Sequence, residues 1–199
     1  MALLPVGSLE IPANVSPGSP VTYEYIVDLF TQLSQAFPGT GLTADVAISD
    51  SATNTALVSS PVLVSPAAGT VWQLEAWGIY STPGSGPATM SWICYNGGSS
   101  GTALATIPAI TPSTSLTSCL WRATAIVDFY SATAAQCELA VLLGTSASTD
   151  AASAYLASPT STTGTAITTD NALSLNFVFG SAVVGSTLTA LGGFAKQIA

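Results

Sequence analysis

The side chains of this sequence that could carry out chemistry are carboxylates. The chain holds 10 acidic residues, 2 basic residues and no histidine, for a net charge of -8. Glu75, Asp128 and Glu138 fall in stretches that we expect to be strands, and glycosidases use two carboxylates about 5–9.5 Å apart. If residues 131–135 form a symmetric turn, Asp128 and Glu138 face each other, and a bridging cation or a shared proton would have to offset their repulsion. The alternatives, which we favour, are that the strands pair in a different register or that these are solvated surface carboxylates.

Histidine, cysteine and glycine-rich motifs provide no stronger candidate for a functional site than the carboxylates do. The missing histidine removes the Ser-His-Asp triad, the Cys-His dyad and histidine-ligated metal sites. Cys94, Cys119 and Cys137 form no C-x-x-C pair, so we interpret them as buried apolar side chains, with one disulfide or a nucleophile as alternatives. The glycine-rich stretch 97–102 lacks the lysine and the following helix of a phosphate-binding loop. We therefore expect no catalytic, metal or cofactor site.

Tryptophan is the residue that could line a carbohydrate cleft beside such carboxylates. The chain has 4 of them: Trp72, Trp77, Trp92 and Trp121. The same residues can equally fill a hydrophobic core, so the pattern does not by itself favour a glycan-active enzyme.

From residue 41 onward, apolar and polar residues alternate with the period of two that is typical of strands. One example is the set Leu173, Leu175, Phe177 and Phe179, with the polar residues Ser174 and Asn176 between its first three members. Turn-forming clusters of Gly, Pro, Ser and Asn separate the stretches. The predicted strands are Leu42–Ser49, Ala56–Val64, Thr70–Ser81, Ala88–Tyr95, Ala103–Ile110, Trp121–Tyr130, Gln136–Gly144, Ala172–Gly180 and Thr187–Ile198, with a weaker one near Ala152–Leu156. This succession predicts an all-β domain over residues 41–199, an antiparallel β-sandwich and most simply a jelly roll.

The first 40 residues differ from the rest. Residues 1–18 hold three prolines and no sustained period, which predicts an extended arm that could contact a neighbouring protein through Leu3, Leu4, Val6, Leu9 and Ile11. Residues 19–40 predict one amphipathic helix and a turn, with an N-cap signal at Ser19-Pro20. The apolar stripe of this helix consists of Tyr23, Ile26, Phe30, Leu33 and Phe37. It could pack on the domain's own sheet or in a symmetric helix bundle.

The charge composition predicts what the protein binds. Only 6% of residues are charged, whereas a solubilising surface has about 25–35%. We therefore expect self-association, most simply as a trimer. Arg122 and Lys196 alone cannot neutralise a phosphate backbone, so we expect no nucleic-acid partner. The uncharged run 171–195 is interrupted by polar residues and glycines, which argues against a membrane span.

Four ordered phrases of the sequence, Glu75–Thr82, Tyr95–Ala105, Trp121–Ala123 and Asp170–Leu175, carry a resemblance to a known family. They resemble the succession in structural virion proteins of tailed bacteriophages, particularly of actinobacterial hosts, over roughly residues 70–198. The helix at 19–37 and the three cysteines depart from that pattern.

The resemblance implies a β-sandwich on the particle surface, in a capsid decoration protein, a minor capsid protein or a tail-associated component, and it brings no catalytic residues. We expect a non-enzymatic protein that stabilises the shell through contacts with itself and with the major capsid protein, made in the host cytoplasm without a secretion signal. The alternatives are a tail fibre or adhesin that binds a host-surface glycan and, last, a carboxylate-based glycan-active enzyme.

Overall fold

The computed structural model describes residues 39–41, 45–145, 152–158 and 164–199. The chain divides into two compact units, 1–39 and 40–199, and the fold below is that of the second. The predicted arm at 1–18 and the predicted helix at 19–37 lie outside the described residues, and so do all ten apolar contact residues expected there. In the ranges that are described, no helix is long and apolar enough to cross a membrane.

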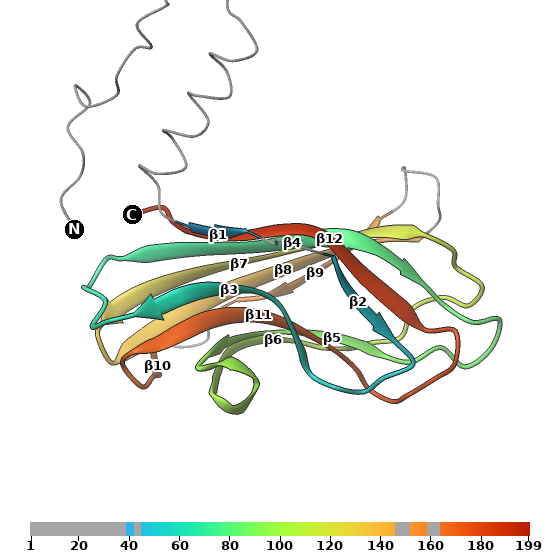
Figure 1. The fold of residues 1–199 in the computed structure, drawn as a ribbon, viewed down its shortest axis with the longest axis horizontal. Coiled ribbons are helices and arrows are strands. Elements are labelled where there is room, and N and C mark those ends of the chain that lie inside the picture. The colour runs from blue at the N-terminus through green and yellow to red at the C-terminus, as the bar shows by residue number, and fades with distance from the viewer. Residues whose placement is uncertain (1–38, 42–44, 146–151, 159–163) are drawn as a thin grey trace, which may run out of the picture. The chain divides into compact units, whose positions relative to one another are not determined.

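Two antiparallel sheets form the domain (Figure 1). The strands of the large sheet are β1 (Gly39–Gly41), β2 (Val46–Ser49), β4 (Val71–Ser81), β7 (Cys119–Ser131), β8 (Ala134–Gly144), β9 (Ala152–Ala157), β10 (Thr165–Ala166) and β12 (Thr187–Gln197). Those of the small sheet are β3 (Thr55–Leu63), β5 (Met90–Asn96), β6 (Thr102–Ile110) and β11 (Asn171–Phe179). A short 3-10 turn, η2 (Gly98–Ser100), joins β5 to β6. The predicted β-sandwich is confirmed.

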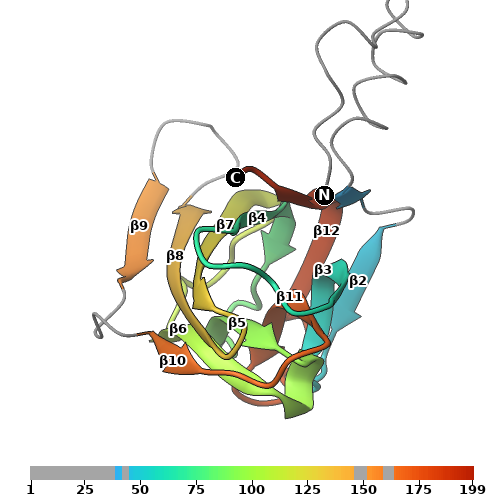
Figure 2. The same cartoon turned by 90° about the vertical axis from the view of Figure 1, so that its left-hand side faces the viewer.

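The strand order is that of a jelly roll. Neighbouring strands run β2-β12-β4-β7 in the large sheet and β3-β11-β5-β6 in the small one. The chain thus crosses between the sheets from β2 to β3, from β3 to β4, from β4 to β5, from β6 to β7, from β10 to β11 and from β11 to β12, as the eight strands of two Greek keys require. Strands β8, β9 and β10 extend the large sheet beyond β7. Seen from the side, β2 and β9 lie at opposite borders of this sheet (Figure 2).

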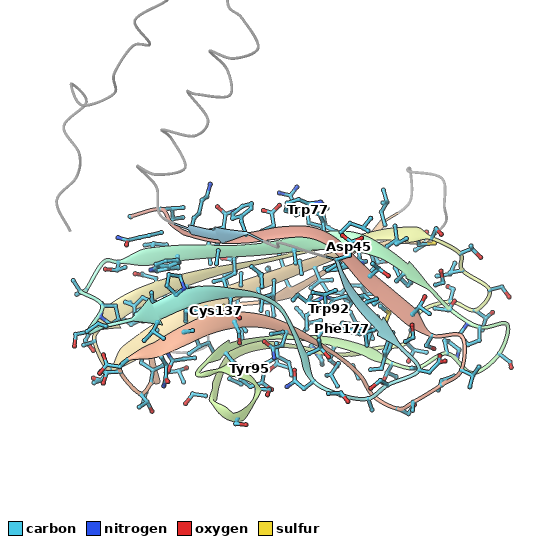
Figure 3. All side chains as sticks on the ribbon, viewed as in Figure 1. Asp45, Trp77, Trp92, Tyr95, Cys137 and Phe177 are labelled. Carbon is cyan, nitrogen blue, oxygen red and sulfur yellow. The ribbon has the colours of Figure 1, made fainter. Side chains whose placement is uncertain are left out.

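The core between the sheets comes from the alternating inward positions of each strand. On β4 these are Trp72, Leu74, Ala76 and Tyr80, and on β11 they are the four alternating apolar residues found in the sequence. An aromatic cluster links the two layers, because Trp92 on β5 lies 6.0 Å from Trp121 on β7 and 4.9 Å from Phe177, measured between ring centroids. Phe177 also packs edge-on against Phe179, at 4.7 Å. Figure 3 shows Trp92 and Phe177 between the sheets.

From the aromatic cluster we predict the position at which a cavity would lower the stability of the domain most. We expect Phe177→Ala to lower the free energy of unfolding by about 3–5 kcal/mol, since the ring is fully buried and contacts two aromatic neighbours. Urea unfolding measures the loss. The matched control is Val184→Ala at an 82% exposed position, which should stay within about 0.5 kcal/mol. Equal values for the two variants would contradict the described core.

A second prediction concerns alkaline pH. Tyr80 is buried and its hydroxyl donates to the carbonyl of Gly144 at 2.5 Å; burial, with smaller contributions from Cys119 and Tyr155, raises the pKa of Tyr80 to about 12. The folded state therefore keeps a proton that the unfolded chain loses near pH 10, so this stabilisation is complete below about pH 10 and is lost as pH rises toward 12. Urea midpoints at about pH 9 and about pH 11.5 should fall less in Tyr80→Phe than in the parent. An equal fall in both would show that the tyrosine proton contributes nothing.

Candidate functional site

The facing pair of carboxylates that a symmetric turn at 131–135 would produce is not formed. Asp128 lies opposite Gln136, and Glu138 lies opposite Ile126. The turn between β7 and β8 consists of only two residues, and an irregularity next to Phe129 shifts the register further, so the symmetric five-residue turn was wrong. Asp128 and Glu138 are diagonal neighbours instead, and Asp128 accepts a 3.5 Å hydrogen bond from the amide of Gln136.

Glu75, the third candidate, is already engaged. Its Oε1 lies 2.8 Å from the Nη2 atom of Arg122, and its Oε2 accepts a hydrogen bond from Gln73 at 3.1 Å. These partners explain how a carboxylate only 5% exposed is tolerated. Glu75 faces Thr124, four residues along β7 from Asp128, which is about 13 Å at the usual rise per residue. The three carboxylates are therefore not gathered at one point, and no group of three or more potential metal ligands occurs in the described ranges.

The three cysteines are free and buried, as interpreted from the sequence. Cys94 on β5 and Cys137 on β8 interact in the core. Figure 3 shows Cys137 between the two sheets. A hydrogen bond with the Cys94 thiol, and then burial, raises the pKa of Cys137 well above its usual value. Burial also raises the pKa of Cys119, although a backbone hydrogen bond at Thr117 opposes the shift. These thiols are poor nucleophiles and serve as core side chains.

The most unusual feature of the described domain is the outward face of the large sheet. Large apolar side chains project from it at five positions on five strands: Trp77, Leu120, Leu142, Leu156 and Leu191. Their exposed fractions run from 40% for Trp77 to 61% for Leu156. We call this set the outer apolar face. Figure 3 shows Trp77 on the side of the large sheet that faces away from Trp92 and Phe177.

The register brings three leucines of the outer apolar face close together. Leu142 lies opposite Arg122 on β7 and Ala154 on β9, so it is the diagonal neighbour of Leu120 and of Leu156. Diagonal neighbours in a sheet are within reach of long side chains. Trp77 also lies opposite Arg122, which therefore stands between the indole and Leu142.

Glycine on β12 lets the exposed indole lie against the sheet. A Cβ atom at Gly192 would come within 2.4 Å of the Trp77 ring, so a larger residue there would push the indole away. Phe194 packs against the same ring at 6.3 Å, with an angle of 63° between the planes. An irregularity between Ala190 and Gly192 places Leu191 out of the ladder, where it is exposed. The conformation of Trp77 is thus set by its neighbours.

Both basic residues of the chain lie on this face. Arg122 forms the ion pair with Glu75, and Lys196 on β12 places its Nζ atom 5.0 Å from the centroid of the Phe194 ring. From the sequence we noted only that Arg122 and Lys196 are the two basic residues of the chain, and we did not predict that they lie on the same face. The sequence did contain a signal for the outer apolar face. Apolar residues occur on both sides of strand β4, with Trp77 and Ile79 on the outward side in addition to the inward core residues.

Comparison by sequence finds no match, since no protein-family model and no curated protein matches the chain. Comparison by structure finds a chain in "Structure of infectious bursal disease virus Gx strain", with 16% sequence identity and a TM-score of 0.36. The match covers 81% of this chain and 32% of that chain, so the protein spans about a third of the length of the chain it matches.

The buried thiols give a prediction. Ellman's reagent should react slowly with the folded protein, because the thiols are inaccessible and those of Cys119 and Cys137 have raised pKa values. In urea without a reductant, all 3 thiols should react at once. Fast reaction of the folded protein, or a single reactive thiol after unfolding, would contradict the structure.

Proposed function

We propose that the protein is a non-enzymatic structural component of a bacteriophage virion, a capsid decoration or minor capsid protein. In this role it coats or stabilises the shell through self-association and through contacts with the major capsid protein. The observation that carries the proposal is the outer apolar face, because a soluble monomer rarely exposes a contiguous apolar patch of this kind and such patches mark interaction surfaces.

The jelly-roll fold limits the functional classes to consider but does not assign one of them. Viral capsid proteins, lectins and cupins all use this architecture, so the fold alone does not assign a function. A histidine-ligated metal, as a cupin-type enzyme would use, is not available to a chain without histidine. A lectin surface needs several polar groups that converge on a sugar, whereas four of the five exposed side chains here are leucines. A surface made to contact protein fits these side chains best.

The remaining parts of the proposal follow from the sparse charge. A shell component contacts identical or related subunits over much of its surface. Contacts between uncharged groups avoid the free-energy cost of removing unpaired ions from water, which is on the order of several kcal/mol per buried charge. We propose a trimer, since closed rotational symmetry is the common solution for identical subunits. The protein would reside on the particle surface and would not touch nucleic acid or membrane.

One observation favours a second candidate. The partly exposed indole of Trp77 lies opposite the hydrogen-bonding side chain of Arg122, and an aromatic ring beside a polar group can bind a sugar. A tail-associated fibre or adhesin that binds a host-surface glycan is therefore the alternative.

Particles produced with and without the protein test the proposal. We expect the protein to co-purify with intact particles, and particles that lack it to melt at a lower temperature and to resist osmotic shock less well, because lateral contacts over the shell are lost. Unchanged melting and osmotic resistance of the stripped particles would contradict the structural role. Unchanged melting together with lost adsorption to host cells would identify the tail-associated alternative instead.

A further inference from the structure

We propose that the outer apolar face is the surface through which one copy of this chain binds a second copy. The inference rests on the proposed function, which requires self-association, and it specifies the surface that the proposed function leaves open. Four independent features of the described domain support it: the apolar side chains, the protected sheet edges, the distribution of charge and the available area.

The first feature is the exposure of large apolar side chains on the outward face of the large sheet. Leu142, Leu120 and Leu156 are 46%, 55% and 61% exposed, although each projects from the middle or the border of a regular sheet. In an antiparallel sheet that packs on only one side, the outward positions are ordinarily polar. Covering these leucines would remove apolar area from water, which is the main driving force of association.

The second feature is that the sheet edges are poorly suited to pairing with another strand. Both edge strands of the small sheet contain a proline, Pro61 in β3 and Pro108 in β6, which cannot donate a ladder hydrogen bond. The border strands of the large sheet are short, with four residues in β2, six in β9 and two in β10. Association by strand addition is therefore disfavoured, and a sheet face is left as the contact.

The distribution of charge permits contact through the large sheet, although it does not by itself exclude the small sheet, whose strands carry no charged residue. The whole chain has a net charge of -8, so two copies repel each other at most orientations. The outward face of the large sheet carries both basic residues and three acidic ones, Glu75, Asp128 and Glu138, which leaves it one charge below neutral. Two such faces can approach with little repulsion.

The outward face of the small sheet is different in character. Asn176 donates to the side-chain oxygen of Asn54 at 3.0 Å, and Asn54 donates to the hydroxyl of Tyr95 at 3.0 Å. Tyr95 alternates with the core residue Cys94 on β5, which places this amide and hydroxyl network on the outward side. This face therefore carries a network of polar side chains where the large sheet carries leucines, although the Asn176 Oδ1 and Ser174 Oγ atoms have no hydrogen-bond partner among the described residues.

The available area is sufficient for a stable complex. The face spans β12, β4, β7, β8 and β9, which gives a width of about 19 Å at the usual strand spacing. Strands β4 and β8 have 11 residues each, about 36 Å in length. Each copy would then contribute about 700 Å², and the total of about 1,400 Å² lies within the usual range of specific interfaces.

A charge placed on the face tests the inference. Sedimentation velocity and light scattering of the full chain at micromolar concentration should give a mass above one subunit. Leu142→Asp should give the mass of one subunit at the same concentration, because a desolvated carboxylate would stand in the contact. The matched control is Val184→Asp, at a more exposed apolar position in the connection between β11 and β12, which should associate like the parent. Circular dichroism on each variant shows that the strands are retained.

Three outcomes would overturn the inference: a parent chain that stays at the mass of one subunit, a Leu142→Asp variant that associates like the parent, or glycan binding that is lost in Trp77→Ala while the mass is unchanged. The last would assign the face to a carbohydrate. Because purified protein is used, the result is separable from the proposed function. Self-association through this face without any binding to particles would leave the inference standing and reject the virion role.

Discussion

The large sheet carries large apolar side chains on both of its faces, and the arrangement of the domain depends on this constraint. The inward positions of β4, β7, β8 and β12 pack against the small sheet around Trp92 and Trp121, which buries one side. The small sheet can cover only that side, so Trp77 and the leucines that project outward remain in water. The hydrophobic effect that closes the sandwich therefore also favours a further layer over the outward side, and we propose that a second copy of the chain supplies it.

The scarcity of charge has a local consequence as well as a global one. With only two basic residues in the chain, the position of each one matters, and both stand on the outward face of the large sheet. Arg122 neutralises Glu75, which the neighbouring side chains largely bury, and Lys196 lies over Phe194. The two basic residues thus reduce the net negative charge of the outward face, so that a second molecule of the same negative charge can approach it. Elsewhere in the described domain the surface charges are acidic.

Much of the fold could be predicted because period-two alternation reports directly on which side of a strand is buried. The predicted ranges Thr70–Ser81 and Thr187–Ile198 correspond within a residue or so to β4 and β12. Register could not be predicted in the same way, since a two-residue turn and an irregularity beside Phe129 separated Asp128 from Glu138. The outer apolar face was missed because an outward apolar residue such as Trp77 looks, in sequence, like one more core residue. Only the pairing of β4 with β7 and β12 shows which side of the sheet it is on.

Acrylamide quenching of tryptophan fluorescence tests the central claim most directly, because Trp77 is substantially exposed whereas Trp72, Trp92 and Trp121 are buried. The quenchable fraction therefore reports on the outer apolar face. If two copies meet there, this fraction falls as the protein concentration rises through the range in which the mass increases, and Leu142→Asp keeps it constant. A quenchable fraction that stays constant in the parent while its mass increases would show that the copies meet elsewhere and would contradict the account.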